Sequence, residues 1–263
     1  METLMHIKNR LTDIFEASNK PLLNIYFTAG FPALEDTVLI LKALEKAGVD
    51  MIEIGMPFSD PLADGPTIQE SSEIALQNGM TIKKLFEQLE GIRNHISIPI
   101  MLMGYLNPVM QYGIKNFCES ARKVGVDGII LPDLPFDEFN EFYAKYFHEN
   151  QLSNIFLVTP ETSTQRLHQI DRSASGFIYA VSTNSTTGGT KDLTHAASYF
   201  ERLNNEKLNN PIMIGFNINN KENFRYACNF ANGAIIGSAF IKMLKESKNI
   251  EADIIQFVDS IKN

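Results

Sequence analysis

The sequence predicts an α/β protein built as a single (β/α)8 barrel, with an extra helix before the first strand. Three observations support this prediction: short apolar runs alternate with longer amphipathic stretches, eight such runs follow at even spacing, and one unit occurs twice in similar form. The chain has 263 residues, and barrels of this kind occupy roughly 250 residues. We therefore assign residues 1–263 to one domain.

The apolar runs are rich in Ile, Val, Leu and Phe, and polar residues do not alternate regularly with apolar ones inside them. Such near-continuous apolarity is typical of parallel strands that are covered on both faces. We predict strands at Leu22–Thr28, Val49–Ile54, Ile98–Met103, Val126–Leu131, Asn154–Thr159, Gly176–Val181, Pro211–Phe216 and Gly233–Gly237.

The stretches between these runs have the spacing of amphipathic helices. The last of them places Ile250, Ile254, Phe257 and Ile261 on one helical face. We expect the extra helix before the first strand around Leu4–Glu16.

A weak internal repeat favours a closed barrel. Lys46–Ile54 resembles Lys123–Leu131, and in each copy a helix ends at a glycine before an aspartate leads into a strand. A doubly wound open sheet is the alternative, but eight units of similar length favour closure. In a barrel, chemical groups lie at the carboxyl ends of the strands and in the loops that follow them.

The composition excludes several classes of function. A net charge of −8 and a pI of about 5.2 argue against nucleic acid or an anionic membrane as the main partner. Cys118 and Cys228 are far apart and lack the spacing of a metal site, so we expect free thiols, and nothing in the sequence demands a metal. Met1–Lys20 does not look like a signal peptide, and no apolar run approaches a membrane span of roughly 20 residues. We expect a cytoplasmic protein.

Acidic residues mark the end of the second predicted strand. Glu53 lies inside an apolar run near its carboxyl end. It is either a buried carboxylate satisfied by its neighbours or, as its position in a barrel favours, an acid/base group whose pKa is raised by apolar surroundings. Asp60 and Asp64 follow on the next loop, in Asp-Pro and Asp-Gly pairs that also form turns. Asp64 is either such a turn residue or reaches back over the barrel mouth toward Glu53, which would make a two-carboxylate site.

A second group of candidate residues is expected on the opposite side of the barrel. The loop after the sixth strand is rich in glycine and hydroxyl side chains, and it includes Thr187 and Gly188. Gly237 and Ser238 end the last strand and open a helix. Backbone N–H groups and the positive end of a helix bind phosphate at this place in many barrels, although a glycine turn with a serine cap has the same sequence. We predict a phosphate site here.

The stretch Ile52–Gln69, with the sequence IEIGMPFSDPLADGPTIQ, has the form of a family signature. Further segments at strand ends fit the same family in order: Thr28–Gly30, Met103–Pro108, Leu131–Pro135, Gly215–Phe216 and Gly237–Ser238. Together, over essentially the whole chain, these segments resemble the alpha subunit of tryptophan synthase. The resemblance implies a lyase of L-tryptophan biosynthesis that cleaves indole-3-glycerol phosphate into indole and glyceraldehyde 3-phosphate by a retro-aldol reaction.

The resemblance also implies roles for single residues. Glu53 would protonate C3 of the indole ring and take the proton of the glycerol hydroxyl, and Asp64 would accept a hydrogen bond from the indole N–H. Tyr179 would lie beside Glu53. Such a reaction needs one carboxyl group that is acid and base near neutral pH and another that stays ionised.

Binding residues follow from the same resemblance. It implies that the indole ring is lined by Tyr26, Met103, Tyr105 and Phe216. It implies phosphate contacts at Thr187, Gly188, Asn217, Gly237 and Ser238. The family works as an α2β2 complex in which the beta subunit carries pyridoxal phosphate and receives indole, so this chain would hold no cofactor. Asp60 would face the beta subunit.

Two departures from the family pattern concern the phosphate side. The family loop often begins Arg-x-Gly, whereas this chain has Thr183-Asn184-Ser185, and the usual glycine after Phe216 is Asn217. Because Asn tolerates unusual backbone angles, we expect a working site with altered phosphate affinity or loop closure. A Thr183→Arg variant with an unchanged KM and unchanged loop proteolysis would refute this expectation.

Three alternatives stay open at this point. Another barrel enzyme such as indole-3-glycerol phosphate synthase would need a lysine at a strand end, which the sequence does not offer. A non-catalytic subunit that activates a beta partner is disfavoured by the intact Glu53 and Asp64. The third is a variant that releases free indole without a partner.

Overall fold

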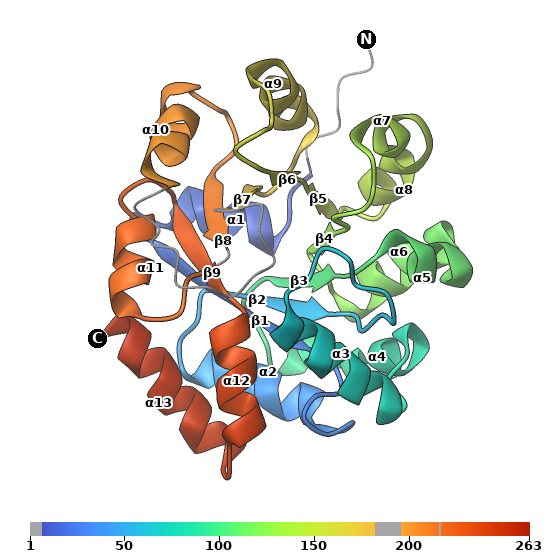
Figure 1. Cartoon of the computed structure of the whole chain (residues 1–263). Coiled ribbons are helices and arrows are strands. Elements are labelled where there is room, and N and C mark those ends of the chain that lie inside the picture. The colour runs from blue at the N-terminus through green and yellow to red at the C-terminus, as the bar shows by residue number, and fades with distance from the viewer. Residues whose placement is uncertain (1–6, 182–195, 216) are drawn as a thin grey trace.

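The computed structural model describes residues 7–181, 196–215 and 217–263 (Figure 1). The strands lie at the centre of the molecule and the helices surround them, as Figure 1 shows. They form one sheet in the order β5-β4-β3-β2-β1-β9-β8-β7-β6. Their bounds are β1 Leu22–Thr28, β2 Met51–Gly55, β3 Ile100–Met103, β4 Gly128–Ile130, β5 Ser153–Ile155, β6 Leu157–Val158, β7 Ile178–Val181, β8 Ile212–Gly215 and β9 Gly233–Ile236.

The sheet closes through a single chain segment. β5 pairs with β4 in parallel, β6 pairs with β7 in parallel, and only Phe156 separates β5 from β6. The predicted strand Asn154–Thr159 is therefore present in two pieces that join the first and last members of the sheet. This closure confirms the predicted (β/α)8 barrel, and the open-sheet alternative is wrong.

Four predicted strands, those from Val49, Ile98, Val126 and Gly176, begin two residues too early. For two of them the reason is the end of the preceding helix. The glycines that end the preceding helices, Gly48 and Gly125, have positive φ angles of 79° and 84°. The next residues, Val49 and Val126, donate their N–H groups back to Leu44 and Ala121 in those helices. An apolar residue at this place belongs to the end of the helix, where it packs against the last turn. A prediction from apolar residues alone therefore makes the strand too long.

The helices lie in the connections between strands, and several connections contain two helices. Their bounds are α1 Arg10–Ala17, α2 Asp36–Lys46, α3 Pro66–Gln77, α4 Ile82–Leu89, α5 Leu106–Tyr112, α6 Ile114–Val124, α7 Phe136–Glu138, α8 Ala144–Glu149, α9 Thr164–Ser173, α10 Ala197–Asn205, α11 Lys221–Ala227, α12 Ser238–Glu246 and α13 Ile250–Lys262. A 3-10 turn, η1, spans Ile92–Asn94, and a π-helical turn, η2, spans Phe139–Tyr143. No helix in the described ranges is both long and apolar enough to cross a membrane.

The protein has two apolar cores. The larger one lies between the strands and the surrounding helices, and the smaller one fills the barrel with side chains such as Met51, Met101 and Met213. Leu11 of α1 belongs to the inner core and is fully buried. The predicted extra helix is thus confirmed at Arg10–Ala17, where it covers the amino-terminal end of the barrel.

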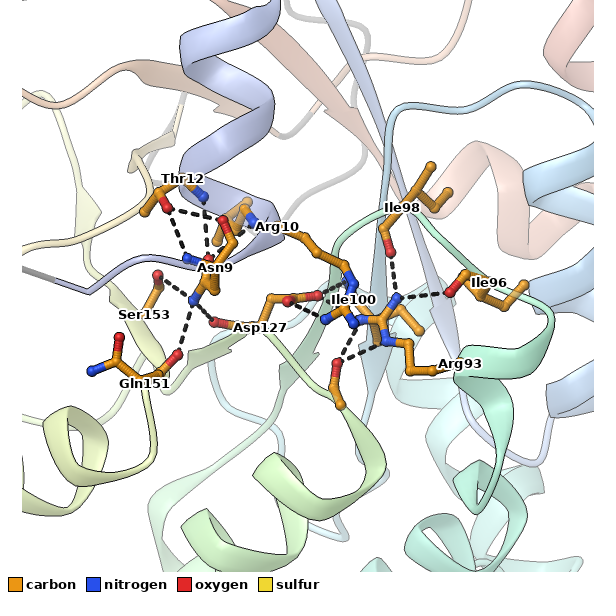
Figure 2. A network of polar contacts seen from close by, with 12 residues as sticks. Asn9, Arg10, Thr12, Arg93, Ile96, Ile98, Ile100, Asp127, Gln151 and Ser153 are labelled. Carbon is orange, nitrogen blue, oxygen red and sulfur yellow. Dashed lines mark hydrogen bonds and ion pairs between the residues drawn. The ribbon is translucent and has the colours of Figure 1, made fainter.

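A polar network holds α1 in this place (Figure 2). The buried carboxylate of Asp127, just before β4, accepts hydrogen bonds from Arg93 at 2.5 Å, from Arg10 at 3.1 Å and from the backbone N–H of Ile100 at 3.0 Å. The side chain of Asn9 donates to the backbone carbonyls of Asp127 and Gln151. The amino-terminal end of the barrel is therefore closed, and the carboxyl ends of the strands form the other mouth.

Candidate active site

Glu53 lies on β2 with its side chain inside the barrel. Side chains on a strand alternate between the two faces, and Met51, two residues earlier, belongs to the inner core. Glu53 is fully buried, and Asn24 on the neighbouring strand β1 donates from Nδ2 to Glu53 Oε1 at 2.6 Å. The other oxygen, Oε2, has no hydrogen-bond partner among the described residues. One side of this carboxyl group is thus held, and the other is open to a further group.

Burial controls the protonation of Glu53. Loss of water around the carboxyl group raises its pKa to about 8, although the hydrogen bond from Asn24 lowers it. Glu53 is therefore mostly protonated at neutral pH, and it is able to give up a proton and take one back within the physiological range.

Asp64 lies on the loop between β2 and α3, and Tyr105 fixes it. The Tyr105 hydroxyl donates to Asp64 Oδ2 at 3.0 Å and accepts the N–H of Ala63 at 3.0 Å. Burial raises the pKa of Asp64 to about 6, against the lowering effect of the Tyr105 hydrogen bond. At neutral pH Asp64 is mostly ionised while Glu53 is mostly protonated.

Two buried tyrosines complete the cluster. Burial raises the pKa of Tyr26 and of Tyr179, and the negative charges of Glu53 and Asp64 raise both further. This electrostatic coupling brings each of the two tyrosines within range of both carboxyl groups.

Strand glycines make room for the two tyrosine rings. A Cβ atom at Gly55 would lie 2.1 Å from the Tyr26 hydroxyl oxygen, and one at Gly215 would lie 2.3 Å from the Tyr179 hydroxyl oxygen. Real Cβ atoms do not approach other atoms so closely. Glycine is therefore needed at both positions if the rings are to cross the barrel.

A pair of aromatic rings lies beside Asp64. The rings of Phe58 and Tyr105 have centroids 5.3 Å apart, and Met103 is partly exposed at the end of β3. Tyr26, Met103 and Tyr105 were predicted to line an indole pocket. In the structure, the Tyr105 hydroxyl bridges Ala63 and Asp64.

The phosphate candidates are only partly described. Asn217 has a φ of +58°, the left-handed region that glycine prefers, so it takes the backbone angle expected for the family's glycine. Gly237 is the N-cap of α12, and a Cβ atom there would lie 3.4 Å from the Tyr26 ring, so the start of α12 lies beside the cluster. Ser238 is exposed as the first residue of α12. The candidates Thr187, Gly188 and Phe216, together with residues 183–185, lie outside the described residues.

Asp60 lies on the outward part of the same loop as Asp64. It is exposed, and its carboxylate accepts a hydrogen bond from the Ser59 hydroxyl at 2.5 Å. Leu62, two residues further, is 88% exposed, which is unusual for a leucine. This loop therefore has an inward half that carries Asp64 and an outward half with an apolar residue facing solvent.

Sequence analysis missed Asn24 and Phe58. Asn24 has a recognisable signal, because an amide in the middle of the apolar run Leu22–Thr28 needs a buried partner. Phe58 stands within the signature stretch but gives no pattern of its own. No group of three or more His, Cys, Asp or Glu side chains suited to a metal ion occurs in the described part of the chain.

Comparisons with known proteins match the chain to one family. The family model for "Tryptophan synthase alpha chain" matches residues 14–262. The chain is 54% identical to the tryptophan synthase alpha chain of Flavobacterium psychrophilum over 244 residues, which are 92% of this chain and 96% of the relative. It is 52% identical to that of Christiangramia forsetii over 255 residues, covering 97% and 98%.

Solved structures are similar as well. The crystal structure of the tryptophan synthase alpha chain from Legionella pneumophila superposes with a TM-score of 0.87 at 34% identity, covering 97% of this chain and 96% of that one. A chain of tryptophan synthase from M. tuberculosis, in an aminoacrylate-bound form, gives a TM-score of 0.85 at 28% identity, covering 97% and 98%.

Proposed function

The chain belongs to the tryptophan synthase alpha chain family, the lyases that cleave indole-3-glycerol phosphate in tryptophan biosynthesis, and we propose that Glu53 and Asp64 are the two residues that carry out this cleavage. The observation that carries the proposal is the pair of buried carboxyl groups with separated pKa values, about 8 for Glu53 and about 6 for Asp64. Near pH 7 the pair thus consists of one acid and one carboxylate, which is the division of roles that the reaction needs.

The reaction then takes two proton transfers through Glu53. Protonated Glu53 gives its proton to C3 of the indole ring, a C3–H bond forms, and the positive charge spreads to the ring nitrogen. Ionised Asp64 accepts a hydrogen bond from the ring N–H and stabilises that charge. The Glu53 carboxylate then takes the proton of the hydroxyl group on the adjacent glycerol carbon. A carbonyl forms there, the bond to C3 breaks, and its electrons return to the ring.

Binding of the two ends of the substrate uses different parts of the barrel mouth. We assign the indole ring to the apolar surface of Tyr26, Met103 and Tyr105, with Phe216 completing it. We assign the phosphate to the backbone N–H groups at the start of α12, at Gly237 and Ser238, because the N-terminus of a helix attracts anions. Asn217, Thr187 and Gly188 complete this phosphate site in our proposal.

The partner in this proposal is a tryptophan synthase beta subunit in an α2β2 complex. The exposed half of the loop that holds Asp60 and Leu62 supports a docking role, because burying an exposed leucine favours association. The same loop carries Asp64, so docking would also order the site. We further propose that residues 1–263 act as one catalytic domain, and that the enzyme works in the cytoplasm, where free thiols such as Cys118 and Cys228 persist.

The test is release of indole from indole-3-glycerol phosphate by the purified chain, with and without a matched beta subunit. We expect weak release alone and a sharp rise with the beta subunit. Glu53→Gln should abolish cleavage while native circular dichroism is kept, and Asp64→Asn should lose less but still substantially. High activity without the beta subunit would identify a free-standing lyase. No release under either condition would favour the non-catalytic subunit and refute the proposal.

A further inference from the structure

Asn24 is an amide placed inside a barrel that is otherwise apolar around it. It is fully buried on β1, and its register partners on the two neighbouring strands are Met51 and Ile235. Burying an amide without compensation costs about 1–3 kcal/mol by protein mutational data. A side chain of that cost in a strand interior calls for a reason other than packing.

Among the described residues, Glu53 is the one hydrogen-bond partner of the Asn24 side chain. Nδ2 donates to Glu53 Oε1 at 2.6 Å, whereas Asn24 Oδ1 has no partner among residues 7–181, 196–215 and 217–263. Glu53 Oε2 likewise has no hydrogen-bond partner among these residues. The amide therefore makes a short, single contact with one oxygen of the carboxyl group and leaves the other oxygen open.

We infer that Asn24 is a positioning residue that reserves Glu53 Oε1 as a hydrogen-bond acceptor, so that the proton is carried and exchanged by Oε2. The inference rests on the proposed role of Glu53 and adds which of its two oxygens reacts. An oxygen that accepts an N–H cannot carry a proton along the same direction, so in the acid form the proton lies on Oε2 and Oε1 is the carbonyl oxygen. In the carboxylate form the same N–H stabilises the negative charge.

The surroundings of Glu53 leave Asn24 as the group that distinguishes its oxygens. The titratable groups that interact electrostatically with Glu53 are Tyr26 on β1 and Tyr179 on β7, and both also interact with Asp64 on the loop after β2. Among the described residues, none of these groups donates a hydrogen bond to Oε2 of Glu53, and the register partner of Glu53 on β3 is the apolar Met101. The amide of Asn24 also lowers the pKa of Glu53, as a donor to the charged form must.

Two substitutions separate this role from packing. Asn24→Val removes the amide and keeps a side chain suited to a strand. Asn24→Asp keeps the shape but replaces the donor by a second carboxylate, which would share a proton with Oε1 and draw it away from Oε2. If Asn24 only filled space, the isosteric Asp variant would be the milder one. Our inference predicts the reverse order.

The assay follows glyceraldehyde 3-phosphate through a coupled dehydrogenase, with a matched beta subunit present, from pH 5 to pH 10. We expect kcat to fall at least tenfold in Asn24→Val and about a further tenfold in Asn24→Asp, with KM within about twofold of the parent value. In Asn24→Val the alkaline limb of the rate should move up by about one pH unit. The pKa of Glu53, measured by titrating its ¹³C carboxyl resonance, should rise by the same amount. This resonance is identified by its absence in Glu53→Gln.

Asn154→Val is the matched control. Asn154 is a buried asparagine on β5, and one of its side-chain atoms, Nδ2, has no hydrogen-bond partner among the described residues. It is bonded to neither Glu53 nor Asp64. We expect it to keep the parental pH limb. The inference would be overturned if both Asn24 variants kept the parental kcat and the parental alkaline limb. It would also be overturned if kcat fell less in Asn24→Asp than in Asn24→Val. If Asn24→Val does not fold, the kcat of the isosteric Asp variant decides. Activity in Glu53→Gln would instead refute the proposed function.

Discussion

Replacing Glu53 by glutamine should stabilise the protein at alkaline pH. The pKa of Glu53 rises from an ordinary value of 4.5 to about 8, mainly because burial disfavours the charged form. At about 1.4 kcal/mol per pH unit, ionised Glu53 lowers the free energy of unfolding by up to roughly 5 kcal/mol. Glutamine keeps the shape and the acceptor oxygen for Asn24 but never carries the charge.

The sign of this effect follows from linkage. An acid whose pKa is raised by folding favours the folded state at low pH, and that contribution is lost as the pH rises from about 4.5 through about 8. Ionisation of Asp64 also lowers the free energy of unfolding as the pH rises from 3.8 to about 6, but it does so equally in the parent and in Glu53→Gln. The difference between Glu53→Gln and the parent therefore isolates Glu53.

The assay is urea unfolding followed by circular dichroism at each pH unit from 5 to 9. We expect the free energy of unfolding of Glu53→Gln, relative to the parent, to increase by about 1.4 kcal/mol per pH unit up to pH 8 and then to level off. Leu39→Ala, an exposed substitution that removes no titratable group, is the control and should give a constant difference. A constant difference for Glu53→Gln as well would refute the raised pKa and the acid role built on it.

Three further predictions concern the site and its support. The kcat/KM for cleavage should be highest between about pH 6 and 8 and should fall on the alkaline side as Glu53 ionises and on the acid side as Asp64 is protonated, which a pH–rate profile measures. Tyr105→Phe removes the hydrogen bond that lowers the pKa of Asp64, so the acid limb should move to higher pH and the rate should fall by about tenfold; an unmoved limb would contradict the contact. Leu11→Ala should lower the free energy of unfolding by about 2–5 kcal/mol in urea titrations, because it leaves a cavity in the inner core at the amino-terminal end of the barrel. Leu39→Ala, at an exposed position, should lower it much less.

The barrel could be predicted because its signal is repeated. Each strand is a compact apolar run, and eight such runs determine the class even when single bounds are off by two residues, as at Val49 and Val126. The break of the fifth strand at Phe156 could not be predicted, because the residue is apolar and fits a strand. The break arises from closing the ring, which is a property of the whole sheet.

The site could be predicted less fully than the fold. Glu53 and Asp64 are visible because carboxylates are rare near apolar strand ends. The clamp by Tyr105 depends on which way one hydroxyl points, since the same residue type would also fit a purely apolar wall. Asn24 is visible as an anomaly in its strand, but its partner on β2 follows only from the register that pairs Asn24 with Met51 and places Glu53 within reach.

Burial alone does not separate structural from functional carboxylates in this barrel. Asp127 and Glu53 are equally hidden, with exposed fractions of 1% and 0%. Asp127 is surrounded by two arginines and a backbone N–H, so its charge is neutralised where it holds α1 to the barrel (Figure 2). Glu53 has one neutral amide and, among the described residues, no cation. A carboxyl group that is buried without a cation keeps its proton to higher pH and stays ready to transfer it. A buried carboxyl group thus holds the structure together at one end of the barrel, and we propose that another transfers protons at the other end. The difference lies in the groups that surround each of them.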